Sequence, residues 1–184
     1  MKTKYIFILI VLTCLCVLPL AAEEQPSYML FDQSLGGQIG EISGYGLSYQ
    51  KRFDQSAIQT TLGFFFEGNS LITTSVLDFI IGVEYQRTIY GDDFGKWLGG
   101  QIYLFTGGNY RGYIARDFDT SVIQPYSSVF TVGAGIGIEV LLFHHFSIPI
   151  ELGYAVVWEP RGSTDLIEEL KVDLHPQVGL RYRF

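Results

Sequence analysis

Cysteine is almost absent from this chain, and both copies, Cys14 and Cys16, lie in an apolar stretch near the N-terminus. We predict below that this stretch is removed, which leaves a mature chain without any thiol. Such a chain forms no disulfide, binds no metal through thiolates and has no cysteine nucleophile.

Long apolar runs are absent beyond residue 22, although 48% of the residues are hydrophobic. The most apolar later segment, 132–158, is interrupted by Glu139, Glu151 and the His144-His145 pair. A membrane-spanning helix needs about 20 predominantly apolar residues in succession. This segment cannot supply them. A chain that is apolar overall but nowhere continuously so is typical of alternating β-strands.

Positive charge is also scarce. The chain has 12 Lys+Arg against 19 Asp+Glu, and its formal net charge is −7. Removal of residues 1–22 takes away Lys2 and Lys4 and changes the net charge to −9. We expect no nucleic-acid partner, because that kind of binding depends on neutralising phosphates with lysine and arginine.

The N-terminal segment has the three parts of a secretory signal peptide: a basic start, an apolar stretch over residues 5–20 and the small pair Ala21-Ala22. We therefore predict a cleavable signal over residues 1–22 and a mature domain over residues 23–184. Two alternatives stay open. One is an anchoring helix, because an apolar segment of this length nearly spans a bilayer, and the other is a lipoprotein signal at Cys14.

Apolar and polar residues alternate along most of the remaining chain, which is the pattern of strands with one apolar face. We expect strands over residues 44–53, 58–67, 77–86, 97–104, 130–142, 146–158 and 172–184. Most of these segments have about the 9–11 residues that a tilted membrane strand requires.

An eighth strand is expected because the connections alternate between short and long, as they do when strands run up and down. The connections at 54–55 and 143–145 are short, whereas those at 107–129 and 159–170 are long. Parity then requires a strand before residue 44, and we place it at 27–34, followed by a turn at Gly36-Gly37. The expected fold is all-β, an eight-stranded antiparallel up-and-down transmembrane β-barrel.

The polar face favours a membrane barrel over a water-soluble barrel of the fatty-acid-binding or lipocalin kind, which would show the same period turned inside out. That face is mainly Gly, Ser, Thr and Ala with isolated charges and very few lysines. A solvent-facing sheet carries dense charge of both signs. The interior of an eight-stranded barrel, by contrast, is just wide enough for small side chains and a few paired charges.

Charged and titratable residues also fall on the predicted inner face. Because an unpaired buried charge is costly, we expect them to form a hydrogen-bonded ion network that plugs the lumen. The expected members are Arg52, Asp78, Glu84, Glu139, Glu151, Asp173, His175, Arg181 and Arg183. The alternative is a narrow polar conduit or a proton-sensitive gate, for which eight strands leave little room.

The last seven residues, VGLRYRF, alternate strictly. Their apolar members are Val178, Leu180, Tyr182 and Phe184. This ending resembles the C-terminal signal of bacterial outer-membrane β-barrels, which finish in alternating hydrophobic residues and a final Phe. The whole predicted architecture is similar to the small eight-stranded barrels of the OmpX, OmpW and OmpA-barrel type. The resemblance implies location in the outer membrane of a Gram-negative-type cell, contact with its lipid, and insertion by the barrel-assembly machinery.

Signals of catalysis or metal binding are faint. The chain has no nucleophile-elbow motif, and no third metal ligand lies near the His144-His145 pair in sequence. A lipid-modifying barrel enzyme would need a serine near a histidine, and Ser147 beside His145 is the one such pair. We therefore expect no enzyme activity, no metal site and no cofactor.

The long connection at 107–129 carries the residue types of adaptable contact surfaces. The candidates for surface contacts are Tyr110, Arg111, Tyr113 and Arg116. Proteins of the resembling families serve as surface structural proteins, adhesins or passive routes for small hydrophobic molecules. We expect a structural or surface-binding protein whose partner is an extracellular ligand or a host surface. The alternatives are a narrow porin-like pore or hydrophobic route and, less favoured, a lipid-modifying enzyme.

Overall fold

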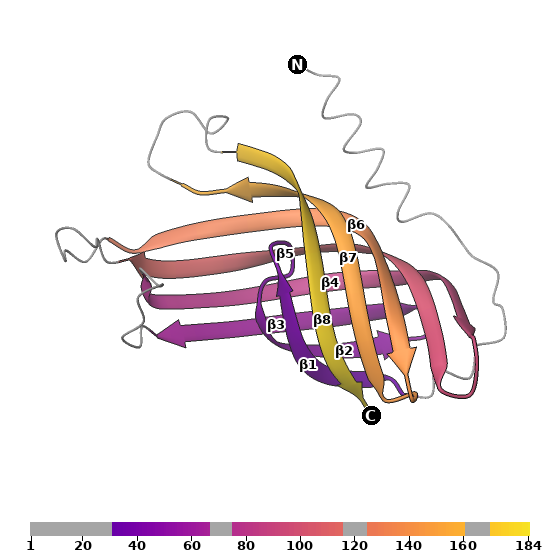
Figure 1. The fold of residues 1–184 in the computed structure, drawn as a ribbon. Helices are drawn as coiled ribbons and strands as arrows, with labels where there is room; N and C mark the ends of the chain where they lie inside the picture. Colours follow the sequence, from indigo (N-terminus) through magenta and orange to yellow (C-terminus); the bar gives the residue numbers. More distant parts are fainter. Residues whose placement is uncertain (1–30, 67–74, 116–124, 161–169) are drawn as a thin grey trace, which may run out of the picture.

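The computed structural model describes residues 31–66, 75–115, 125–160 and 170–184 of the chain (Figure 1). Eight strands form one closed antiparallel ring in chain order, in which the first pairs with the last. They are β1 (Gln33–Gly40), β2 (Gly46–Phe53), β3 (Ser56–Phe66), β4 (Ser75–Asp93), β5 (Leu98–Ala115), β6 (Ser127–Leu142), β7 (Phe146–Trp158) and β8 (Leu170–Arg183). The predicted all-β, eight-stranded antiparallel barrel is confirmed. The predicted signal peptide and its boundary lie outside the described residues.

The two ends of the barrel differ in their connections. At the end where β8 terminates, which we call the turn end, strands are joined by the short turns 54–55, 94–97 and 143–145. The opposite end, which we call the loop end, carries the remaining connections. No helix in the described part of the chain is long and apolar enough to cross a membrane.

The first strand differs from the prediction. β1 begins at residue 33 rather than 27, and both Gly36 and Gly37 lie inside it instead of forming a turn. Gly36 pairs with Arg181 of β8, and a Cβ atom at Gly36 would lie 2.0 Å from the backbone oxygen of Leu180. The glycine therefore permits a close approach between β1 and β8 where the ring closes.

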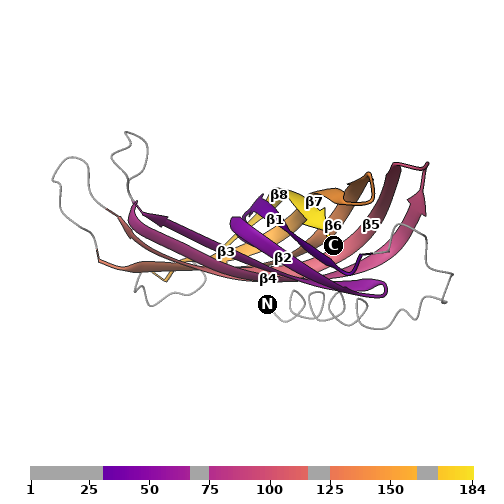
Figure 2. The same cartoon turned by 90° about the horizontal axis from the view of Figure 1, so that it is seen from below.

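The strands are very unequal in length. β1 and β2 have 8 residues each, whereas β4 has 19 and β5 has 18. β3–β6 therefore extend past the closed part of the ring at the loop end (Figures 1 and 2). The predicted loop at 107–129 is shorter than expected, because β5 continues to residue 115 and β6 starts at residue 127. Tyr110, Arg111 and Tyr113 thus lie on a strand.

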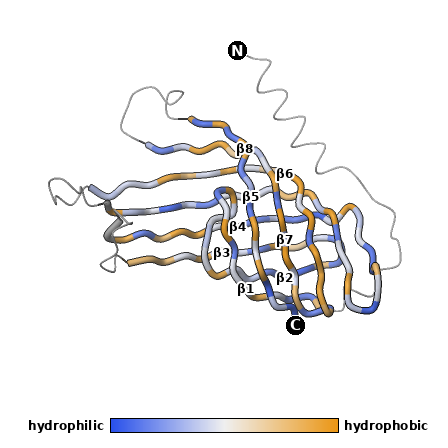
Figure 3. The backbone as a smooth tube through the Cα atoms, viewed as in Figure 1, coloured by the Kyte–Doolittle hydropathy of each residue, from blue (hydrophilic) through white to orange (hydrophobic). Residues whose placement is uncertain are grey.

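Hydrophobic and hydrophilic residues alternate along the strands (Figure 3), and exposed apolar side chains on the outer face alternate with buried polar side chains on the inner face. Ile39 is 70% exposed and Leu180 is 58% exposed on the outside, whereas Gln59 and Glu84 are fully buried inside. This is the reverse of a barrel whose outer surface faces water. The inner and outer faces predicted from the sequence are therefore in place along most of each strand.

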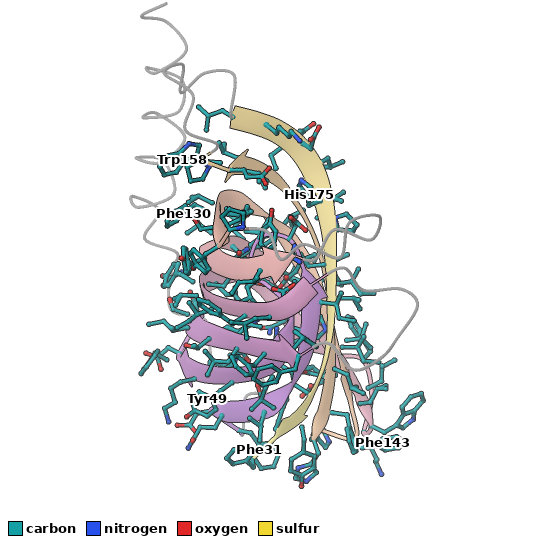
Figure 4. All side chains as sticks on the ribbon, turned by 90° about the vertical axis from the view of Figure 1, so that its left-hand side faces the viewer. Phe31, Tyr49, Phe130, Phe143, Trp158 and His175 are labelled. Carbon is teal, nitrogen blue, oxygen red and sulfur yellow. The ribbon has the colours of Figure 1, made fainter. Side chains whose placement is uncertain are left out.

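Aromatic side chains gather at both ends of the outer surface (Figure 4). At the loop end Phe130 stacks on Trp158, with 5.3 Å between ring centroids. At the turn end Trp97 stacks on Phe143 at 6.0 Å. Two aromatic bands separated by aliphatic residues are the pattern of girdles at the two interfaces of a membrane.

Candidate functional site in the lumen and at its mouth

Three charged side chains meet in the lumen near the turn end. Arg52 Nη2 lies 3.3 Å from Glu139 Oε2, and Arg181 Nη1 lies 3.7 Å from Glu139 Oε1. Arg181 also donates from Nη2 to Gln38 Oε1 at 3.0 Å and to Gln59 Oε1. The contacts of this group join five strands across the lumen, namely β1, β2, β3, β6 and β8. Each of the three charged residues is less than 9% exposed.

A second group lies farther toward the loop end and contains two buried glutamates. Gln86 Nε2 donates to Glu84 Oε1 at 2.7 Å, and Gln177 Nε2 donates to Glu151 Oε2 at 2.9 Å. The Tyr103 hydroxyl donates to Glu151 Oε1 at 2.5 Å. Amide and hydroxyl donors, rather than cations in direct contact, therefore solvate these two carboxylates. The expected ion network is in large part a network of amides.

The remaining predicted members of the network lie at its edges. At the turn end, the Arg183 guanidinium donates to the backbone oxygens of Phe31 at 3.3 Å and His144 at 3.4 Å. At the loop end, Asp78 is 7% exposed and pairs with Arg111. The charged groups are thus distributed along the lumen, from Arg183 at the turn end to Asp78 at the loop end.

The structure does not place Asp173 in the network. Asp173 follows the inward alternation of β8 but is exposed, because the pairing of β8 with β1 stops at Gly40–Gln177. Beyond that point β8 pairs with β7 alone, and no described strand faces Asp173 across the lumen. His175, on the same segment, is half-buried, and its Nε2 has no hydrogen-bond partner among the described residues (Figure 4).

Residues 41–45, which connect β1 to β2, fold into the lumen. Ile42 and Ser43 are fully buried, although they belong to a connection at the end of the barrel. Gln177 Oε1 accepts hydrogen bonds from the backbone nitrogens of Ile42 at 3.0 Å and Ser43 at 2.8 Å. Asn109 Nδ2 donates to the backbone oxygen of Ile42 at 3.1 Å. We call residues 41–45 the inserted segment.

Glycines on the surrounding strands make room for this segment. A Cβ atom at Gly82 would lie 2.1 Å from the backbone oxygen of Ser43, and one at Gly63 would lie 2.2 Å from that of Tyr45. Cβ atoms at Gly133 and Gly153 would each lie 2.9 Å from the Cδ1 atom of Ile42. Four strands thus carry glycine where the segment touches them. Sequence analysis missed the insertion, and its signal was this set of inward-facing glycines.

The insertion makes a labelling prediction. Because the chain has no cysteine after residue 16, a cysteine placed at residue 43 can be labelled selectively. Ser43→Cys should react slowly with a water-soluble maleimide, because the Ser43 side chain is buried. Adding Gly82→Val should expel the segment by steric overlap and raise the labelling rate at least ten-fold. Glu41→Cys, at an exposed position of the same segment, should label rapidly with or without the valine. Rapid labelling of Ser43→Cys alone would contradict the insertion.

The mouth of the lumen, above the inserted segment, holds a compact polar and aromatic group. Arg111 Nε donates to Asp78 Oδ1 at 3.0 Å, and Arg111 Nη2 lies 2.5 Å from Asp78 Oδ2. The Tyr45 hydroxyl donates to Asp78 Oδ2 at 2.9 Å. The Tyr113 hydroxyl donates to Glu159 Oε1 at 3.0 Å.

Two of the predicted loop contacts, Arg111 and Tyr113, therefore belong to this mouth. Tyr110 instead faces outward, where its ring packs against Phe130 with centroids 4.9 Å apart and its hydroxyl bonds to that of Tyr126. The two faces follow from strand alternation, since Tyr110 is adjacent in sequence to Arg111. Arg116 lies outside the described residues.

The serine and histidine considered for catalysis are not aligned with each other. Ser147 is fully buried on the inner face of β7, whereas the Nδ1 atom of His145 lies 3.1 Å from the backbone oxygen of Arg183. The His145 ring stacks on Tyr182 at 5.4 Å. Among the residues that the structure describes, no group of three or more His, Cys, Asp or Glu side chains could hold a metal ion.

No family model matches this chain, and no curated protein sequence matches it. Solved structures do. The N-terminal β-barrel domain of OprF from Pseudomonas aeruginosa aligns with a TM-score of 0.50 at 12% identity, covering 83% of this chain and 95% of that domain. Ail, the attachment invasion locus protein of Yersinia pestis, aligns at 15% identity over 83% of this chain and 96% of Ail, with a TM-score of 0.39. Neisserial surface protein A aligns at 12% identity over 83% and 94%, with a TM-score of 0.39.

The class of fold follows from the ring of eight strands and the OprF alignment together. The chain has the fold of the small eight-stranded outer-membrane β-barrels.

Proposed function

We propose that this protein is an integral outer-membrane barrel of a Gram-negative-type cell, with a structural or surface-binding role, and that it does not conduct. The exposed aliphatic exterior between two aromatic bands supports the membrane location. The observation that carries the function is that buried side chains occupy the lumen at two levels, those of the Arg52–Glu139–Arg181 group and those of residues 41–45. A lumen closed at two levels is suited to support a surface and not to pass solutes.

The proposed orientation follows from the different connections at the two ends of the barrel. The turn end, with the terminal strand β8, faces the periplasm, and the loop end faces outward. Residues 1–22 are removed on export, membrane lipid covers the outer face, and the barrel-assembly machinery reads the final strand. The partner is then an extracellular ligand or a host surface that meets the loop end.

Planar-bilayer recording tests the proposal. The protein purified from membranes should show no steady channels. A variant in which Asn-Gly replaces residues 41–45 should also show none, because the Arg52–Glu139–Arg181 group still closes the lumen. Adding Arg52→Ser, Glu139→Ser and Arg181→Ser to that variant should produce steady channels. Circular dichroism in detergent checks that each variant is folded. Steady channels in the unaltered protein would instead establish a narrow pore.

A second candidate is a side route for small hydrophobic molecules, and one observation favours it. An apolar groove of about 600 Å³ opens on the outside where β1 ends and β2 begins. Its walls include Ile39, Leu180 and Phe65, and the last is an inward-facing residue that is 49% exposed. Uptake of a small apolar solute by cells that produce the protein, compared with cells that do not, tests this route. A difference in uptake with a silent bilayer would favour it.

We assign no catalytic activity to the protein. His145 contacts the backbone oxygen of Arg183, whereas Ser147 is buried on the inner face of β7. A screen for lipid hydrolysis or acyl transfer with the purified protein is the measurement that would reverse this assignment.

A further inference from the structure

We propose that the cavity at the loop-end mouth binds an alkyl cation, meaning an ammonium or guanidinium group on an apolar stem. This inference rests on the proposed surface-binding role and names the ligand class for it. The cavity has a volume of about 370 Å³, which is within the range of small-ligand sites. The inserted segment forms its floor through Glu41 and Tyr45, and β4–β7 form its walls.

The polar groups of the cavity that lack partners can accept hydrogen bonds. Thr131 is 2% exposed and lines the cavity, and its hydroxyl has no hydrogen-bond partner among the described residues. Asn109 uses its Nδ2 group on the backbone oxygens of Glu41 and Ile42, at 2.5 and 3.1 Å, which leaves its Oδ1 atom to accept. Acceptors that line a cavity suit a ligand that brings donors, as an ammonium or guanidinium group does.

The charge of the cavity selects against anions. Among the described residues that line it, Arg111 is the one cation, and Asp78 already neutralises that cation through two hydrogen-bonded atoms. Glu41 and Glu159 also line the cavity, so its formal charge with Asp78 included is negative. A cation entering this mouth gains from two carboxylates in a partly water-excluded space.

The side walls suit the stem of such a ligand. Ile80, Val129 and Val157 give the cavity an apolar side. The Arg111 guanidinium carbon lies 5.6 Å from the centroid of Tyr45 and 5.2 Å from that of Tyr113, so that the two rings are fixed in position before a ligand arrives. An apolar wall facing carboxylates matches an amphipathic side chain such as lysine or arginine.

Isothermal titration calorimetry in an uncharged detergent tests the proposal, with spermidine and a lysine tripeptide amide as probes. Two sources share the chemistry: a free polyamine, or a basic side chain of a partner protein. If both probes bind, a free polyamine is sufficient as the ligand. If the peptide alone binds, the ligand is a basic side chain of a partner protein. Glu41→Gln with Glu159→Gln should raise the dissociation constant at least ten-fold, and Thr131→Val should raise it about three-fold or more.

The matched control removes two negative charges at the turn end, with Asp54→Asn and Asp92→Asn, and should leave the dissociation constant within two-fold. If the control raises the dissociation constant as much as the cavity variants do, the effect comes from the overall charge of the protein and the proposed site is overturned. If neither probe binds, or if a sulfated sugar binds more tightly than both probes, the proposed site is overturned as well. The bilayer measurement is independent of these titrations. Absence of binding with no channels would overturn the cation site alone, whereas steady channels would overturn the proposed closed barrel.

Discussion

Replacing Glu139 with glutamine is expected to lower the free energy of unfolding by about 3–5 kcal/mol, the usual result of removing one partner from a buried ion group. Glutamine keeps the volume and one carbonyl oxygen but removes the negative charge between Arg52 and Arg181. Both guanidiniums are almost fully buried. Without the carboxylate they would repel each other in a space where water cannot solvate them.

The geometry makes Arg181 especially dependent on this carboxylate. Its Nε and Nη1 atoms form no hydrogen bond with any described residue, so that the carboxylate 3.7 Å away compensates them through space. Adding Arg52→Gln to Glu139→Gln should therefore recover part of the lost free energy of unfolding, because one of the two buried guanidinium groups without a carboxylate partner is removed. The two changes should be clearly non-additive.

Urea unfolding in lipid vesicles, followed by the fluorescence of Trp97 and Trp158, measures these effects. The control is Asp32→Asn, which breaks the pair between Asp32 and Lys51 at the exposed turn-end rim. Hydrogen bonding from Lys51 holds the pKa of Asp32 below its usual value, yet solvent screens this pair and its loss should matter far less. Equal unfolding midpoints for the protein and Glu139→Gln would show that the buried group does not stabilise the barrel.

Replacing Tyr182 and Phe184 with serine is expected to remove most of the folded protein from the outer membrane. Tyr182 is the register partner of Leu35 on β1 and of Phe146 on β7, so it lies where the ring closes. Its ring packs against Phe146 at 5.5 Å and Phe184 at 6.5 Å. The double change removes both the outward apolar anchors of the closing strand and its proposed targeting signal.

Membrane fractionation with detection of folded and degraded protein measures the outcome. We expect a several-fold or greater fall in the outer-membrane fraction, with degraded or periplasmic material in its place. Phe66→Ser is the matched control, since Phe66 is equally apolar and 70% exposed but lies at the loop end of β3. Normal levels of the double variant in the outer membrane would show that the ending is incidental to assembly.

Much of the fold could be predicted because alternation is a local property. The period of two assigns each side chain to a face without any knowledge of partners, and parity with connection length then required eight strands. The first strand was misplaced because Gly36-Gly37 has the composition of a turn. Its place inside β1 depends on the close contact with Leu180 of β8, which is far away in sequence.

The site could be predicted less well, because alternation fixes the face of a residue but not its height along the lumen. Asp173 and Glu139 are both on the inner face by sequence, yet one is exposed beyond the closed ring and the other is buried. Height depends on the register between strands and on where β1 and β2 stop, which are properties of the assembled ring.

The sequence by itself determined that this chain forms an eight-stranded barrel with an apolar outside, because apolar and polar residues alternate along each strand. Only the tertiary structure decided which charges meet and what closes the lumen. Glu139 contacts Arg52 from 87 positions away, and residues 41–45 enter the lumen because inward-facing glycines on four strands leave space for them at one level. Such a fit between distant residues has no local pattern, since it exists only once the ring has closed.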